Sequence, residues 1–161
     1  MHILSVNGCD LQGTVDISML SELELLQCAG NGDMTELKLG NHNNLYRINA
    51  HTCRSLTTLN LAGCPDLKEL ILYNASDELQ LNLSANTKLE ELLIDSYKRT
   101  IFPSLDLEFL KTFGMSNAVE EDVVTYKFPN LEDLIVKHFK TLDLSGVPNL
   151  KLLGISSTHA T

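Results

Sequence analysis

A three-position apolar signature returns eight times along this chain of 161 residues, at steps of 19 to 22 residues. Its first positions, called anchors here, are Met1, Leu23, Leu45, Leu67, Leu89, Leu110, Leu131 and Leu150. The residues three and five places after each anchor are also apolar, as in Leu67-x-x-Leu70-x-Leu72. Because 43% of the residues are apolar, independent placement of all these positions has a probability on the order of one in a billion. The spacing therefore predicts a repeat array of eight units that forms a single domain over residues 1–161.

Each unit predicts two short extended segments that are joined by turns. The last two signature positions alternate with a variable residue, as they do in a half-buried strand. A second apolar alternation follows at Val15/Ile17, Leu37/Leu39, Leu59/Leu61, Leu81/Leu83, Leu105/Leu107, Val123/Thr125 and Leu142/Leu144. One such coil cannot bury its own leucines, but stacked coils bury them in a continuous core. We therefore expect a β-rich, right-handed solenoid with about eight short parallel strands and little regular helix.

The units resemble a known consensus. The stretch Met1-x-x-Leu4-x-Val6-x-x-Cys9-x-Leu11 resembles the leucine-rich repeat, LxxLxLxxN/CxL, and the stretches from Leu23 and Leu45 repeat it. The unit length is similar to that of the bacterial types, internalin-like or Bacteroides-like. The resemblance implies the α/β superfamily of solenoids, with Asn31 and Cys53 in a ladder that satisfies backbone groups inside each turn. Later units depart from the pattern, and we expect irregular turns at Ala75, Tyr97, Ala118, Phe139 and Thr158.

Charge and cysteine usage limit the partners and the compartment. A net charge of −9 argues against nucleic acid and anionic membranes, and no run of about 18 apolar residues predicts membrane insertion. The four cysteines lie in columns that do not match between neighbouring units, so we expect buried, reduced thiols instead of disulfides or zinc ligands. Together with the lack of a signal-peptide pattern at the start, this favours the cytoplasm. The resemblance implies a secreted or bacterial cell-surface protein if the chain is a fragment.

No motif predicts catalysis, a cofactor or a metal site. The histidines have no partners at ligand-like spacings, and acidic pairs such as Glu90-Glu91 and Glu132-Asp133 are expected on solvated faces. Phosphate-binding loops and nucleophile motifs are absent from the sequence. We therefore expect a protein that is not an enzyme.

The residues two, four and six places after each anchor are predicted to point outward, on the concave face of the solenoid. In the central units, the candidate partner-binding residues at these positions are Arg47, His51, Glu69, Ile71, Tyr73, Glu91, Leu93 and Asp95. Apolar residues rimmed by tyrosine and charges are typical of protein-binding surfaces, although β-propensity alone also accounts for aliphatic residues on a strand. The leading hypothesis is a non-catalytic scaffold whose partner is another protein.

Two alternatives stay open. Members of the family generally protect their terminal repeats with distinct caps, and neither end of this sequence carries one. The first alternative is that the chain is a structural spacer that self-associates end to end through its uncapped ends. Otherwise it is a piece of something larger, such as the recognition part of a bacterial effector or surface protein.

Overall fold

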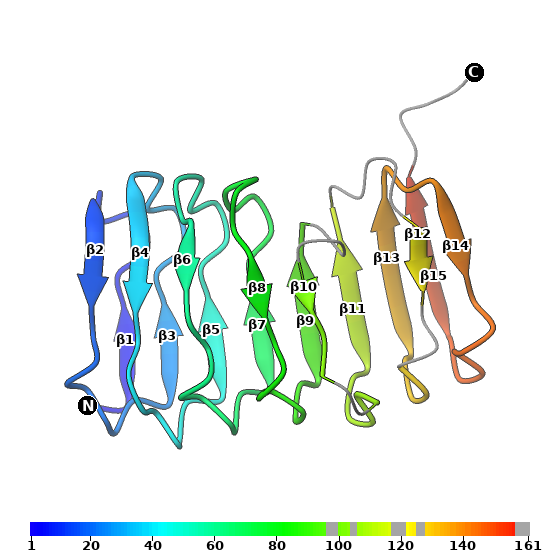
Figure 1. Cartoon of the computed structure of the whole chain (residues 1–161), viewed down its shortest axis with the longest axis horizontal. Helices are drawn as coiled ribbons and strands as arrows, with labels where there is room; N and C mark the ends of the chain where they lie inside the picture. Colours follow the sequence, from blue (N-terminus) through cyan, green and yellow to red (C-terminus); the bar gives the residue numbers. More distant parts are fainter. Residues whose placement is uncertain (96–99, 104–105, 117–121, 125–127, 157–161) are drawn as a thin grey trace.

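The computed structural model describes residues 1–95, 100–103, 106–116, 122–124 and 128–156, which form a solenoid with two rows of strands (Figure 1). The longer row is one parallel sheet of eight strands, in the order β1-β3-β5-β7-β9-β11-β13-β15. These strands are β1 (Ile3–Ser5), β3 (Leu25–Gln27), β5 (Arg47–Asn49), β7 (Glu69–Ile71), β9 (Glu91–Ile94), β11 (Thr112–Met115), β13 (Asp133–Lys137) and β15 (Leu152–Ser156). The structure thus confirms the eight parallel strands, and the described residues contain no helix. Among them, no helical segment could cross a membrane.

The register of this sheet follows the sequence period. Leu26 pairs with Leu4 on one side and with Ile48 on the other, and Leu70 pairs with Ile48 and Leu92. The same in-phase pairing continues from Leu92 to Leu153. The second signature residue of each unit therefore lies directly beside its equivalent in the next unit, as the spacing predicts.

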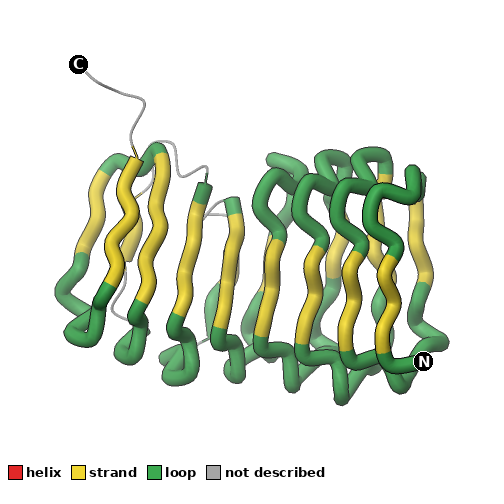
Figure 2. Tube along the Cα trace, turned by 180° about the vertical axis from the view of Figure 1, so that it is seen from behind, coloured by secondary structure: helices red, strands yellow, loops and turns green. Residues whose placement is uncertain are grey.

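The second row consists of shorter return strands in three small sheets. Their strands are β2 (Gly13–Asp16), β4 (Met34–Lys38) and β6 (Thr58–Leu59), then β8 (Leu81–Asn82) with β10 (Thr100–Ile101), and β12 (Asp122–Val124) with β14 (Thr141–Asp143). From behind, they lie beyond the eight-stranded sheet (Figure 2). The prediction at Leu105/Leu107 was wrong, because the return strand of that unit is Thr100–Ile101, which pairs with β8. Leu107 is a buried core residue beyond that strand, and Leu105 and Thr125 lie outside the described residues.

The core fills the space between the two rows of strands. The anchors from Leu23 to Leu131 are fully buried, and so are the second signature residues from Ile48 to Leu134. Each buried leucine contributes about 1.5–3 kcal/mol relative to an exposed one. Toward the C-terminal end, Phe113 and Phe128 replace branched aliphatic residues, with ring centroids 5.1 Å apart. The repeated leucines therefore supply one continuous core, as expected for stacked coils.

The ladder implied by the resemblance is present at Asn31, whose side chain is fully buried. Its Oδ1 accepts hydrogen bonds from the backbone N–H groups of Cys9 (3.0 Å) and Leu11 (3.1 Å). Its Nδ2 donates to the carbonyl oxygens of Val6 (2.9 Å) and Cys28 (2.7 Å). One amide therefore satisfies four backbone groups in two successive turns.

Further along the ladder, Cys53 donates a weaker hydrogen bond from Sγ to the carbonyl oxygen of Cys28 at 3.3 Å. Ala75 and Phe139 are partly buried against the core at the equivalent places. Tyr97, Ala118 and Thr158 lie outside the described residues. The polar ladder thus belongs to the N-terminal units, where the consensus is followed.

All four cysteines are free, and three of them are buried as predicted. Burial raises the pKa of the Cys28 thiol to about 12 and that of Cys64 to about 11. The prediction for Cys9 was wrong, because this residue is exposed. It lies in the first turn, where a neighbouring turn covers it on one side only.

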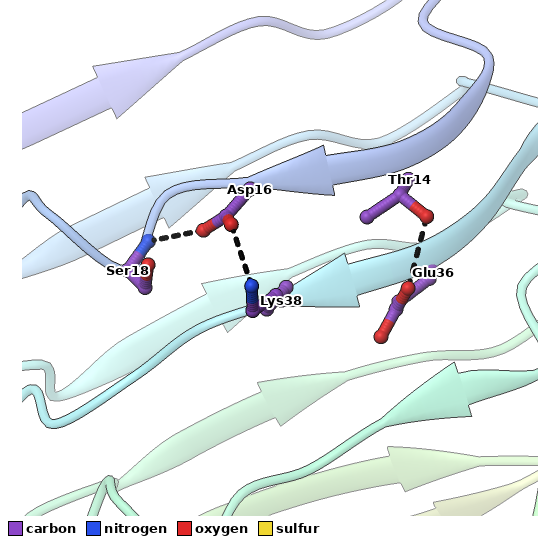
Figure 3. Close-up of polar contacts among 5 residues, drawn as sticks. All are labelled: Thr14, Asp16, Ser18, Glu36 and Lys38. Atoms are coloured by element: carbon purple, nitrogen blue, oxygen red, sulfur yellow. Dashed lines mark hydrogen bonds and ion pairs between the residues drawn. The ribbon is translucent and has the colours of Figure 1, made fainter.

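Polar side chains at equivalent places pair across neighbouring turns. On the return sheet, Lys38 Nζ lies 2.8 Å from Asp16 Oδ2, and Thr14 Oγ1 donates to Glu36 Oε2 at 2.9 Å (Figure 3). Hydrogen bonds from Lys38 and Ser18 hold the pKa of the Asp16 carboxyl well below its usual value. Exposed pairs of this kind add little free energy. Their effect is to favour the in-phase register over a slipped one.

His42 is fully buried, and within the described residues neither ring nitrogen has a hydrogen-bond partner. Leu20 and Cys64 occupy the equivalent places in the neighbouring units. Because an unsatisfied buried polar group destabilises the folded state, we expect His42→Leu to raise the free energy of unfolding by about 1 kcal/mol. Urea denaturation measures this change, with the exposed His2→Leu as a control that stays near the wild-type value. A less stable His42→Leu protein would contradict the expectation.

Candidate protein-binding face

The eight predicted residues lie together on three neighbouring turns. Arg47, Glu69 and Glu91 are register partners on β5, β7 and β9, and Ile71 and Leu93 are partners two residues further along. The other three, His51, Tyr73 and Asp95, follow the ends of the same strands. The structure therefore brings all eight into one region on the outer side of the eight-stranded sheet, which we call the strand face.

Ile71 was predicted to be part of the surface that binds a partner, but only 7% of its surface is exposed. In the register it lies between Asn49 and Leu93, whose side chains flank it on both sides. Leu93 is itself only half-buried. The apolar surface open to a partner is therefore at Leu93 and beyond it, toward β11 and β13.

The charged row of the strand face is only partly neutralised. Arg47 Nη1 lies 2.7 Å from Glu69 Oε2, and both side chains are about two-thirds buried. Glu91 is next in the row and forms no ion pair with any described residue. Burial and the neighbouring Glu69 raise the pKa of the Glu91 carboxyl, and Arg47 opposes this effect.

The three residues beyond the strand ends tie neighbouring turns together. The rings of His51 and Tyr73 are stacked, with centroids 5.1 Å apart and an interplanar angle of 5°. Asp95 accepts hydrogen bonds from the backbone N–H of Ala75 at 2.9 Å and from Ser116 Oγ. These contacts hold the side chains in fixed positions, which lowers the entropy lost when a partner binds.

The structure adds a hollow that the sequence prediction did not include. Gly114 on β11 occupies the row of Ile71 and Leu93, between Leu93 and Ile135. Because it has no side chain, the face is hollowed there by about 310 Å³. The hollow is lined by Tyr73, Leu93, Ile94, Met115, Ile135 and Lys137, among others. The only sequence signal for it was a glycine at an outward position among aliphatic residues.

A second, polar hollow of about 540 Å³ adjoins the first beyond the strand ends. Arg54, Asp77 and Asp95 line it, and it shares Ser116 and Lys137 with the apolar hollow. The strand face thus passes from apolar to mixed charge within two residues along β11 and β13. Within the residues that the structure describes, no group of three or more His, Cys, Asp or Glu side chains could hold a metal ion.

Comparison with known proteins agrees with this geometry. No family model matches the chain. It is 28% identical over 174 residues to an F-box/FBD/LRR-repeat protein of Arabidopsis thaliana, in a match that covers 89% of this chain and 37% of the plant protein.

Among solved structures, the chain is similar to the functional domain of InlJ from Listeria monocytogenes, which includes a cysteine ladder. The TM-score is 0.71 at 21% identity, over 89% of this chain and 32% of the InlJ chain. The chain thus spans about a third of the length of both proteins. The solenoid topology and this likeness confirm that the chain has the leucine-rich repeat fold, as the resemblance of its units implied.

Proposed function

We propose that this chain is a non-catalytic scaffold that binds another protein through its strand face. The observation that carries the proposal is the open apolar area formed by Leu93 and Ile135 around the hollow at Gly114, with charged residues at its edges. Ile135 is 40% exposed although it lies in the middle of a strand. Exposed apolar residues with a polar rim are typical of protein-binding surfaces.

The architecture supports the same proposal. Leucines hold each turn against the next, so the outward residues can vary without loss of the core. The leucine-rich repeat fold suits a protein-binding scaffold, although a fold does not by itself establish a function. The proposal assigns the chain no catalytic step and no cofactor.

The test is to alter the strand face without altering the core. Tyr73→Ala and Leu93→Ala each remove an aromatic or aliphatic group at the edge of the hollow. Partners captured from a lysate on the immobilised chain are identified first, and calorimetry then measures their affinity for each variant. We expect each substitution to weaken binding by about tenfold or more.

Thr14→Ala on the return sheet is the matched control, because Thr14 is partnered across turns but lies on the other row of strands. Its affinity should equal that of the unaltered protein. If Tyr73→Ala and Leu93→Ala fold normally and bind as tightly as the control, the strand face is not the binding surface.

A further inference from the structure

We propose that the hollow at Gly114 receives an aliphatic side chain from a basic, extended segment of the partner protein. The Lys or Arg of that segment lies two positions from the aliphatic residue and contacts Glu91 and Asp133. This inference rests on the proposed function and names the chemistry of the partner at the same face.

The space at Gly114 is the first support. An added Cβ at this position would lie 2.5 Å from Leu93 Cδ2, so the Leu93 side chain leans over the glycine. On the other side, Ile135 is the register partner of Gly114 on β13. A closed cavity of about 150 Å³ already holds a molecule the size of benzene. The open hollow of about 310 Å³ therefore has room for one aliphatic side chain between Leu93 and Ile135.

The charges beside the hollow are the second support. Thr112 lies two residues before Gly114, and its register partners are Glu91 and Asp133. Neither carboxyl group forms an ion pair with a described residue. Glu69 is already neutralised by Arg47, whereas these two side chains flank an uncharged threonine. The two carboxyl groups therefore form an acidic site beside the hollow.

The distance between the acidic site and the hollow determines how far apart the aliphatic and basic residues of the partner segment must be. Residues two apart on a strand point to the same side, about 6.6 Å from each other. Thr112 and Gly114 are separated by this distance, and an extended partner segment presents its own side chains with the same period. A segment with Leu and Arg two positions apart can thus fill the hollow and reach both carboxyl groups at once.

The residues at the other end of the hollow indicate how the partner segment is oriented on the strand face. Two residues after Gly114, Ser116 bonds to Asp95, and Lys137 lies on the next strand. Asp95 is already bonded to Ser116 and to the backbone of Ala75, so it is less available to a partner. The cation of the partner is therefore expected beside Glu91 and Asp133, away from Lys137. The net charge of −9 also attracts a basic segment at long range.

The experiment uses the 161-residue chain and a labelled peptide, Gly-Ser-Gly-Leu-Thr-Arg-Gly-Ser-Gly. Amide chemical shifts are followed by NMR during titration, and fluorescence polarisation gives the affinity. Two control peptides carry Glu in place of Arg, or Ser in place of Leu. We expect the first peptide to shift the amide resonances of Gly114 and its neighbours, and to bind about tenfold tighter than either control peptide.

Protein variants separate the two contacts. Glu91→Gln with Asp133→Asn should weaken binding of the Arg peptide about tenfold. Gly114→Val should weaken it too, because its Cβ would lie 2.5 Å from Leu93 Cδ2 and would force that side chain to move at the edge of the hollow. The matched control is Glu22→Gln with Glu78→Gln, which removes the same charge from two exposed places elsewhere and should change the affinity less than about twofold. Equal binding of the Arg and Glu peptides, or shifts confined to other strands, would overturn the inference.

The outcome also distinguishes this inference from the proposed function. A captured partner whose binding depends on Tyr73 and Leu93, but not on Glu91 and Asp133, overturns the basic segment and supports the strand face. If the affinity of the partner does not change in any of the variants at these four positions, both proposals are overturned.

Discussion

Asn31→Ala is expected to lower the free energy of unfolding by about 4 kcal/mol. The side chain satisfies four backbone groups, of which the Cys28 carbonyl is bonded by the shortest contact, 2.7 Å. Alanine leaves these groups without a partner, and each buried one costs about 1–3 kcal/mol. The bonds to Val6, Cys9 and Leu11 are only part-buried, so these three backbone groups can turn to water, which keeps the total below the full sum. Urea denaturation followed by circular dichroism measures the loss.

The matched control is Asn130→Ala. Asn130 also bonds a backbone carbonyl one turn away, that of Glu108 at 2.8 Å, but its side chain is exposed. We expect this variant to lose less than about 1 kcal/mol. Because each turn contacts only its neighbours, hydrogen exchange in Asn31→Ala should accelerate first in β1 and β3. Equal losses in the two variants would show that the buried amide has no special role.

The eight-stranded sheet could be predicted because its pattern is redundant. A slip of one residue in any strand would turn Leu26, Ile48 or Leu70 to the outer side, so the in-phase register is strongly favoured. The same redundancy made Asn31 predictable as a ladder residue once the unit resembled a known consensus. The register of the sheet depends on repetition over all eight units, whereas the ladder prediction depends on the N-terminal units that follow the consensus.

The return strands could be predicted less well because their pattern has fewer positions. In the fifth unit, Leu105/Leu107 offered an alternation, but the strand that pairs with β8 is Thr100–Ile101. Pairing needs an extended backbone beside the previous turn, and two apolar residues alone do not identify which segment lies there. Cys9 shows a related limit, because its column predicts burial only where turns stack on both sides.

The sequence predicted which residues form the candidate face, but it did not predict which of them are exposed or where the face is hollowed. The alternation of apolar and variable residues predicts which side chains point outward. All eight candidate residues do lie on neighbouring turns. Exposure depends on the conformation of the side chains beside each residue. Ile71 is buried between its partners, whereas a hollow remains beside Gly114, which has no side chain. Neither result follows from the spacing of apolar residues.

Gly63→Ala is the second substitution with a large expected effect, and it tests how closely the corners of neighbouring turns approach. A Cβ at Gly63 would lie 2.0 Å from the carbonyl oxygen of Gly40 in the preceding turn. This obstacle is backbone, so no rotation of a side chain relieves the contact, and the two corners must separate. The corners are also joined by a hydrogen bond of 2.8 Å from the N–H of His42 to the Gly63 carbonyl oxygen. We expect the free energy of unfolding to fall by about 3 kcal/mol.

Gly32→Ala is the control that separates steric overlap from backbone strain. A Cβ at Gly32 would have no atom within 4 Å, and neither Gly32 nor Gly63 has a positive φ. Alanine is therefore conformationally allowed at both places, and it reduces the entropy of the unfolded chain by the same amount. Gly32→Ala should stay within about 1 kcal/mol of the unaltered protein in urea denaturation. If the two variants unfold at the same urea concentration, the corners of the second and third turns can part without cost, and the close stacking at Gly63 contributes nothing to stability.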